Sequence, residues 1–454
     1  MPENRQSIHG EWGSRWAFIL AATGSAVGLG NIWRFPYIVG ENGGGAFILV
    51  YFACILLVGV PVMMAEILLG RHGRQSPINT MRALPRRYGA RPAWQTLGWL
   101  GVLAGFLVLS FYSVVAGWAL AYVPYSAAGT FTGADTQAVE QFFSQLLASP
   151  GQLLLWHTLF MALTAGIVSR GVERGLEKGV QLLMPLLFLL LLVMVGYGMG
   201  AGAFTEALAY MFTPDFGALS GKAVLVAMGQ AFFSMSIGLG AIMAYGSYLS
   251  SRSSVPGNTG LIAGADTIVA ILAGLAVFPI VLAAGLDPGS GPGLIFVTLS
   301  YGFGQMPAGA FFGTLFFLLV SFAALSSAIS IMEPATAYLV ETRRWRRPWA
   351  TTAVAGAAWL VGIGSVLSFN AWSGVKLFGL NFQQIMEYLS TSIMLPLGGL
   401  LIAVFAGWVL PAQVTAEELS FPAQWGYRLW RGAIRYLVPA AILVIFINSL
   451  GLLG

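Results

Sequence analysis

Two glycine-rich stretches, GSAVGLGN at residues 24–31 and SMSIGLG at residues 234–240, decide the fold. Each interrupts a hydrophobic segment long enough to cross a membrane, and the two segments are the first and the sixth of their kind along the chain. Close helix packing would explain the glycines of either stretch alone. The pair, flanked by polar side chains, favours two broken helices at corresponding places of an inverted repeat, the pattern that marks a transporter site near the bilayer midplane.

The composition supports a chain built for a lipid bilayer. Of the 454 residues, 57% are hydrophobic and only 9% are charged, whereas a soluble domain has about 25% charged residues. So few charges cannot cover a soluble core of this size, and the many Phe, Trp, Leu and Ile residues exclude disorder. We therefore expect a membrane protein with many spans. Glycine, at 58 residues, is about twice as frequent as its usual share of about 7%.

Few residues offer the chemistry of a metal centre or an enzyme. Cys54 is the only cysteine and lies in an apolar run, so neither an intramolecular disulfide nor a thiolate cluster is expected. His9, His72 and His157 are scattered without the spacing of metal ligands. Neither a GxSxG elbow nor a phosphate loop occurs, so we expect no enzyme activity. The first residues lack the apolar core of a cleavable signal peptide.

Eleven segments are apolar and long enough, at about 20 residues, to span the bilayer. They lie near residues 15–38, 44–69, 94–124, 152–169, 178–201, 222–250, 259–285, 309–340, 349–369, 382–410 and 434–453. The predicted fold is an all-α membrane protein with eleven transmembrane helices, in which a 5+5 inverted repeat with broken helices 1 and 6 is followed by one extra C-terminal helix. The predicted parts are a cytoplasmic N-terminal segment (1–14), the first repeat with helices 1–5 (15–201), an extracellular loop (202–221), the second repeat with helices 6–10 (222–410), a cytoplasmic loop (411–433) and helix 11 (434–454).

Basic residues predict the orientation in the membrane. With the spans above, all Lys and Arg residues except Arg34, Lys222 and Lys376 fall on one side, and cytoplasmic loops carry the excess of basic residues. The N-terminus is therefore expected in the cytoplasm and the C-terminus outside. The positive net charge of +5 lies in short loops without a nucleic-acid-binding motif, so no nucleic-acid partner is expected.

Four stretches resemble a known family. GSAVGLGNIWRFP at 24–36, ENGGGAF at 41–47, GQAFFS at 229–234 and AALSS at 323–327 are similar to motifs of the neurotransmitter:sodium symporter family, and the resemblance extends over nearly the whole chain. It implies sodium-coupled uptake of an α-amino acid by alternating access across the inner membrane of a bacterium. The lipid bilayer and the small substrate are then the expected partners, and no obligate protein partner is implied.

By similarity, two sodium ions are expected as cofactors. The first would be held by Ala26, Asn31, Ser234, Asp266 and the substrate carboxylate. The second would be held by Gly24, Val27, Ala323, Ser326 and Ser327. Sodium is a hard cation that prefers such oxygen ligands. A lone serine in an apolar helix usually bonds back to a carbonyl of its own helix, but the adjacent pair inside the matched motif favours ligation.

Asp266 also bears on whether transport requires chloride. A charged residue near a helix centre costs about 2.5 to 3.5 kcal/mol on insertion scales, so Asp266 should have a cationic partner. Many animal members have a neutral asparagine here and require chloride, whereas a fixed carboxylate balances sodium directly. We therefore expect transport without chloride. A solvated aspartate at a helix end is the alternative.

The resemblance also implies the substrate site. Members that carry monoamines have an aspartate at the position of Gly28, so its absence favours an α-amino acid whose own carboxylate completes the sodium shell. The expected site residues are Ser25, Ala26, Gly28, Leu29, Gly30, Val108, Tyr112, Phe233, Ser234, Ser236, Leu239, Ser327 and Ile331. The part around the substrate side chain is uncharged, which disfavours acidic and basic amino acids. Leu239 leaves room for an aromatic side chain.

Four residues match gate positions of the family: Arg34 and Glu387 on the outside, and Trp12 and Glu341 on the inside. Tyr112 and Phe233 would form a thinner lid over the substrate. The arginine of the family's inner ion pair is not in register, since His9 occupies its place and Arg5 lies four residues earlier. A proton-coupled carrier of the same fold, a ligand-gated channel and a sensor are the alternative functions.

Overall fold

Long apolar helices make up most of the protein. The computed structural model describes residues 7–217, 219–289 and 293–449, and these ranges contain helices and no β-strand. Nine helices of the described chain are long and apolar enough to cross a membrane: Gly45–Gly73, Pro92–Ala127, Pro150–Val168, Val172–Met199, Val255–Ala283, Gly309–Arg343, Arg347–Ser368, Phe382–Val409 and Gln424–Ile447. A helix satisfies its own backbone hydrogen bonds, which lipid cannot do.

Several of these spans consist of α-helices joined by π-helical turns. The first contains α3 (Gly45–Cys54) and α4 (Val60–Gly73), and the fourth ends in α9 (Lys178–Met199). The last two contain α17 (Phe382–Glu387) with α18 (Leu395–Val404), and α20 (Gln424–Gly432) with α21 (Val438–Ser449). The others are α6 (Gln95–Ala127), α8 (Pro150–Val168), α13 (Val255–Ala283), α15 (Gly309–Arg343) and α16 (Arg347–Ser368).

The first predicted span is broken at the glycines from which the break was predicted. Helix α1 (Arg15–Ala26) is capped by Ser14, whose side chain accepts a hydrogen bond from the Ala17 amide, and it ends where Val27 turns extended. After Gly28 and Leu29 the chain re-enters a helix, first as a π-helical turn and then as α2 (Phe35–Glu41). The two halves, Arg15–Ala26 and Gly30–Glu41, are bent by 49° and count as a tenth span if taken together.

The sixth predicted span is broken as well. Helix α11 (Gly221–Ser234) ends just before six residues outside regular helix, and α12 (Ala241–Ser247) follows them. Gly238 and Gly240 adopt φ of +84° and +72°, a conformation that residues with a Cβ rarely adopt. Both hydrophobic segments are thus interrupted at the predicted glycines, whereas their places in an inverted repeat stay a prediction.

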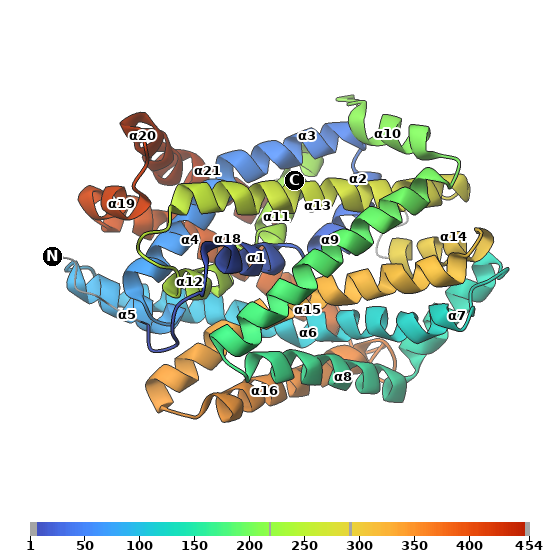
Figure 1. The fold of residues 1–454 in the computed structure, drawn as a ribbon, viewed down its shortest axis with the longest axis horizontal. Helices are drawn as coiled ribbons and strands as arrows, with labels where there is room; N and C mark the ends of the chain where they lie inside the picture. The colour runs from blue at the N-terminus through green and yellow to red at the C-terminus, as the bar shows by residue number, and fades with distance from the viewer. Residues whose placement is uncertain (1–6, 218, 290–292, 450–454) are drawn as a thin grey trace.

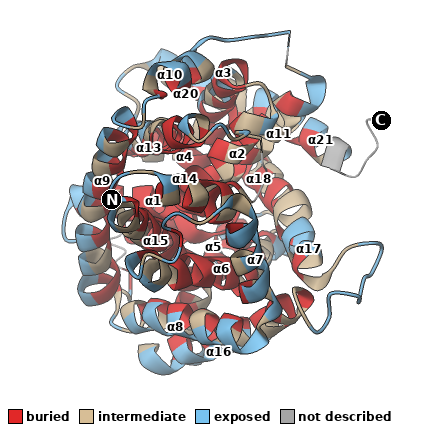
Figure 2. Cartoon of the chain, turned by 90° about the vertical axis from the view of Figure 1, so that its right-hand side faces the viewer, coloured by how far each residue is buried: buried red, intermediate tan, exposed pale blue. Residues whose placement is uncertain are grey.

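Most of the broken helix α1 is buried inside the molecule. It packs against α9, α12, α13 and α15, while α6 and α15 run side by side through the molecule (Figure 1). Helices α8 and α16 pack on each other at the periphery, and their outward faces are exposed (Figure 2). These faces carry exposed leucines such as Leu155 and Leu360, as expected of surfaces that face lipid. The exposed leucines therefore lie on outer helices, around a buried centre.

Some predicted boundaries differ from the structure. The last helix begins at Gln424, ten residues before the predicted start. The polar stretch before residue 434 continues the helix, because its arginines share one face of it. Helices also occur where loops were predicted: α5 (Pro77–Arg87), α7 (Thr136–Ala148), α10 (Phe204–Phe212), α14 (Ser300–Gln305) and α19 (Ala412–Leu419). Arg5 and residues 450–454 of the predicted last helix lie outside the described residues.

Candidate functional site

One cavity lies between the two helix breaks. It is lined by residues of α1, α6, α11 and α15 and of the segments that follow the breaks: Ser25, Ala26, Gly28, Leu29, Gly30, Val108, Tyr112, Phe233, Ser236, Leu239, Ser327 and Ile331. These are twelve of the thirteen residues predicted to bind substrate. Ser234 does not line the cavity. It is buried next to Tyr51, with the two hydroxyl oxygens 2.9 Å apart.

One end of the cavity presents hydrogen-bond donors. The Leu29 amide donates to the Tyr112 hydroxyl over 3.3 Å, so both groups point at the same place at the start of a helix. Amides at a helix start attract anions such as carboxylates. Gly28 has to be a glycine here, because a Cβ would lie 3.0 Å from the Tyr112 hydroxyl oxygen and would overlap Ser327. This end is thus shaped by backbone rather than by a charged side chain.

The side chains that line the rest of the cavity carry no charge. Val108, Phe233, Leu239 and Ile331 supply its apolar lining. The Ser236 hydroxyl, which also lines the cavity, donates to the Ser25 carbonyl over 2.7 Å and joins the two breaks. An acidic or basic side chain would find no counter-charge among these lining residues.

A second group of predicted residues surrounds Asn31. The Asn31 amide group donates to the Asp266 carboxylate over 2.8 Å and to the Asp266 carbonyl over 3.2 Å. Both side chains are fully buried, and in the described part of the chain Asn31 Oδ1 and Asp266 Oδ2 have no hydrogen-bond partner. Two buried, unsatisfied oxygens beside a broken helix suit a hard cation. Since Asp266 is completely buried, the alternative of a solvated helix-end aspartate is wrong.

A third group lies where α15 crosses the first break. The Ser327 hydroxyl is 3.3 Å from the Gly24 carbonyl and 3.4 Å from the Val27 carbonyl. The Ser326 hydroxyl is 3.5 Å from the Val27 carbonyl and bonds back to the Ala323 carbonyl over 2.9 Å. All five predicted oxygen donors of the second sodium site are thereby brought together. The described residues contain no cluster of three or more His, Cys, Asp or Glu side chains.

A second cavity lies on the far side of Tyr112 and Phe233. These two residues and Leu29 line both cavities, so Tyr112 and Phe233 stand between them as the predicted lid would. Arg34 and Glu387 also line the second cavity. They form no ion pair in the described chain; instead the Arg34 guanidinium lies 4.8 Å from the centre of the Phe233 ring. The predicted closure by an Arg34–Glu387 pair stays a prediction.

The predicted inner gate residues are held in a buried network. Trp12 donates its indole N–H to the Tyr245 carbonyl over 3.0 Å. Glu341 accepts from Ser76 and Asn79 of the α5 region, and His9 Nε2 lies 3.1 Å from Glu341 Oε1. The histidine therefore occupies the position of a partner to Glu341, which the sequence left in doubt because Arg5 was out of register.

Three buried polar residues near the breaks were not predicted as part of the site. Gln230 donates to the Gly30 carbonyl over 2.8 Å, Glu66 accepts the Gly238 amide over 2.6 Å, and Tyr51 contacts Ser234. Each one bonds to a residue in or next to a break. Gln230 could have been predicted as a site residue, because it lies inside the matched GQAFFS motif. For Glu66 and Tyr51, the only signal in the sequence was a polar residue within an apolar span.

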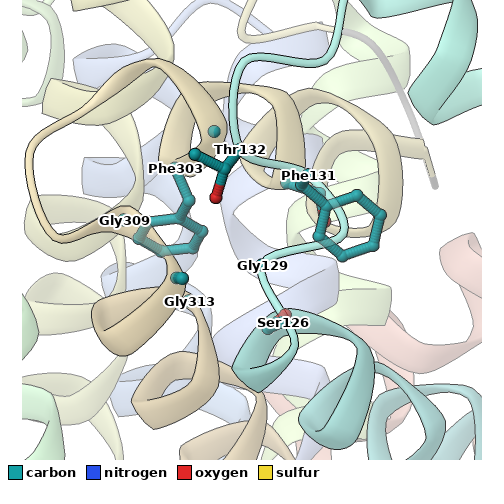
Figure 3. Close-up of a pocket in the computed structure, with 10 residues that line it drawn as sticks. Ser126, Gly129, Phe131, Thr132, Phe303, Gly309 and Gly313 are labelled. Atoms are coloured by element: carbon teal, nitrogen blue, oxygen red, sulfur yellow. The ribbon is translucent and has the colours of Figure 1, made fainter.

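A third cavity lies apart from the site, where the end of α6 meets the connection from α14 to α15 (Figure 3). Phe131 and Phe303 flank it, and Gly309 and Gly313 leave the space open. None of the residues predicted for sodium or substrate lines it.

The comparisons with known proteins agree with the arrangement. The model of the sodium:neurotransmitter symporter family matches residues 9–138 and 131–453. The uncharacterized sodium-dependent transporter YhdH of Bacillus subtilis is 36% identical over 458 residues, 98% of each chain. The uncharacterized sodium-dependent transporter MJ1319 of Methanocaldococcus jannaschii is 31% identical over 96% of this chain and 90% of its own.

A solved structure of MhsT in complex with L-phenylalanine shares the fold, with a TM-score of 0.89 and 42% identity over 97% of this chain and 99% of MhsT. Relatives that match along the whole chain are transporters and not enzymes. The chain thus belongs to the sodium:neurotransmitter symporter family of multi-pass, sodium-dependent membrane transporters.

Proposed function

We propose that the protein is a symporter that couples sodium to the uptake of a neutral, hydrophobic or aromatic α-amino acid by alternating access, without chloride. The observation that carries the proposal is the cavity between the two helix breaks. Its hydrogen-bonding groups at Leu29 and Tyr112 suit a carboxylate, and the rest of its lining is uncharged. The relative MhsT was solved in complex with L-phenylalanine, an amino acid of this class.

Two sodium ions are proposed as co-transported substrates. The first would bind at Ala26, Asn31, Ser234 and Asp266, next to the substrate carboxylate, and the unsatisfied oxygens of Asn31 and Asp266 support it. The second would bind at Gly24, Val27, Ala323, Ser326 and Ser327, which the crossing of α1 and α15 brings together. Sodium would tie the ends of the broken helix to the bundle and so couple ion binding to closure.

Alternating access gives each gate a proposed role. Arg34 and Glu387 would pair above the Tyr112–Phe233 lid when the outside closes, since both already line the outer cavity. Trp12, Glu341 and their partners would separate when the inside opens. The proposed architecture is eleven spans, with α11 and α12 together forming one, in a 5+5 inverted repeat plus one helix, and with the N-terminus in the cytoplasm of a bacterium.

A thermal-stability screen tests the proposal. Purified protein is heated with each of the twenty amino acids, in sodium and in matched potassium buffer. We expect neutral hydrophobic or aromatic amino acids to raise the unfolding temperature in sodium only, because a ligand stabilises the state that binds it. Stabilisation by none of them would contradict the assignment of the substrate.

Uptake into proteoliposomes separates the alternative functions. A symporter concentrates its substrate when a sodium gradient is applied, whereas a channel cannot. Accumulation driven equally well by a proton gradient without sodium would indicate the proton-coupled carrier instead. Ser327→Ala provides the matched variant, because it removes one proposed sodium ligand and leaves the charge of the site unchanged.

A further inference from the structure

Three arginines at the start of the last span form a row on one helix face. Arg428, Arg431 and Arg435, called the arginine row below, are spaced i, i+3 and i+7 along α20 and the π-helical turn that follows it, Ala433–Leu437. Residues at this spacing share a face. Helices α19 and α20 lie together at the end of the molecule that also holds α5 (Figure 1).

The row lacks an acidic counterpart. No carboxylate of residues 7–217, 219–289 or 293–449 pairs with Arg428, Arg431 or Arg435. The nearby Glu418 is already engaged by Arg71 and His72, at 2.8 Å and 2.9 Å. Three positive charges close together repel one another unless an anion joins them.

Two of the arginines are held in place by neutral groups. Arg435 donates Nε to the Gly407 carbonyl over 2.7 Å, and its guanidinium lies 4.7 Å from the centre of the Trp408 ring. Arg431 donates to the Thr415 hydroxyl over 2.7 Å and so ties the last span to α19. Within the described ranges, neither Arg428 nor the Nη atoms of Arg435 donate a hydrogen bond. The row is therefore ordered, with free donors left over.

Aromatic side chains place the row at the membrane surface. Trp408 is 51% exposed, Tyr436 is 62% exposed, and their rings meet edge to face. Tryptophan and tyrosine gather at the level of lipid headgroups. Trp425 and Leu429 of α20, the helix that carries Arg428 and Arg431, are exposed too. A soluble anion would leave this apolar surface uncovered, whereas the acyl chains of a lipid would cover it.

We propose that the arginine row, with Trp408 and Tyr436, binds the headgroup phosphate of an anionic phospholipid. Guanidinium groups bind phosphate oxygens through two parallel hydrogen bonds. A zwitterionic lipid would bring its own ammonium group next to three arginines, so a lipid with net negative charge is preferred. Basic pockets between membrane helices have this function in general.

Native mass spectrometry of the full chain in detergent tests the site. The protein is mixed with equal amounts of phosphatidylglycerol and phosphatidylcholine that carry the same acyl chains. We expect a several-fold preference for phosphatidylglycerol in the unchanged protein, and its loss in the double variant Arg428→Gln/Arg435→Gln. The control Arg343→Gln/Arg346→Gln removes the same charge from exposed arginines between α15 and α16 and should keep the preference.

Three results would overturn the proposal. The first is equal binding of the two lipids by the unchanged protein. The second is an equal loss of binding in the control and in the double variant, which would mean diffuse charge attraction. The third is displacement of the lipid by soluble glycerol phosphate at equal concentration, which would mean a site for a free anion. If the double variant fails to fold, the single variant Arg428→Gln decides. Arg428 is exposed, and its loss breaks no hydrogen bond in the described chain. This variant should lower the preference for phosphatidylglycerol at least twofold.

Discussion

Asp266 and Asn31 share a buried hydrogen bond at the level of the first helix break, and each keeps an oxygen without a partner in the described chain. If Asp266 is ionised when sodium binds, its negative charge offsets the ion inside a region that water does not reach. A cation taken out of water without such a counter-charge loses several kcal/mol. Under the proposed function, the side chain at this one position would therefore decide whether an external anion is needed.

The variant Asp266→Asn should make transport dependent on chloride. We expect uptake in chloride medium to be partly retained, and uptake in gluconate medium to fall at least tenfold, which corresponds to about 1.4 kcal/mol or more of lost ion stabilisation. Radiolabelled uptake into proteoliposomes measures both. The unchanged protein in gluconate is the control. Full activity of the variant without chloride would refute charge balance by Asp266.

His9 gives the proposed inner gate an imidazole partner in place of a guanidinium. Its contact with Glu341 is an ion pair only when the imidazole is protonated, whereas arginine is always charged. Glu341 is fixed by Ser76 and Asn79 in any case. A permanent positive charge at position 9 should thus strengthen the contact and keep the gate closed.

Transport should accordingly respond to the charge of the side chain at position 9. We expect efflux from proteoliposomes to be severalfold slower in the variant His9→Arg than in His9→Gln, because arginine adds a permanent ion pair to Glu341 and glutamine adds none. Radiolabelled efflux measures both variants, with the unchanged protein as the reference. Equal efflux from the two variants would mean that this contact does not limit the opening of the gate.

At the scale of the elements, the second break depends on glycines that a helix would not require. Gly238 has φ of +84°, its amide donates to Glu66, and a Cβ there would lie 2.8 Å from the Leu395 carbonyl oxygen. Gly229 lies in the middle of α11 with an ordinary helical backbone, and a Cβ added there would meet no atom of the described chain within 4 Å. The two glycines of one broken span thus differ in what they do.

Alanine substitution should separate these roles. Gly238→Ala combines a left-handed backbone, which costs about 1–2 kcal/mol, with a clash, so we expect a drop of several degrees in unfolding temperature and a loss of uptake. Gly229→Ala should be neutral or slightly stabilising, because alanine favours the helix. Differential scanning fluorimetry and uptake test both. Equal tolerance of the two substitutions would mean that the break does not need Gly238.

The sequence predicted these elements unevenly, for physical reasons. The breaks were predictable, because motifs of glycine and small polar residues are local signals, whereas the twelve residues around the cavity followed from the family resemblance. Helices such as α5 and α10 lie in polar stretches without the apolar length of a span. The contact between His9 and Glu341 joins residues 332 positions apart, and only the packing of α15 against the N-terminal segment brings it about.

At the scale of the whole molecule, the number of spans fixes the sides of the two termini. Nine long helices and the bent pair at α1 give ten crossings in the described chain. Helices α11 and α12 are each too short to cross alone, at 14 and 7 residues, but together they would supply the eleventh. An odd number places the termini on opposite sides, and an even number places them on the same side.

Reporter fusions in a bacterial host decide between ten and eleven crossings. Because basic residues favour the cytoplasm, we expect a green fluorescent protein fused before α1 to fluoresce. After α21 we expect alkaline phosphatase to be active, since this enzyme requires the periplasm, and green fluorescent protein to be dark. A fusion of each reporter between α4 and α6, next to Arg86, serves as the cytoplasmic control, because this connection precedes α11 and α12. Inactive phosphatase and bright fluorescence after α21 would mean an even number of crossings, and α11 with α12 would then have to enter and leave the membrane on one side.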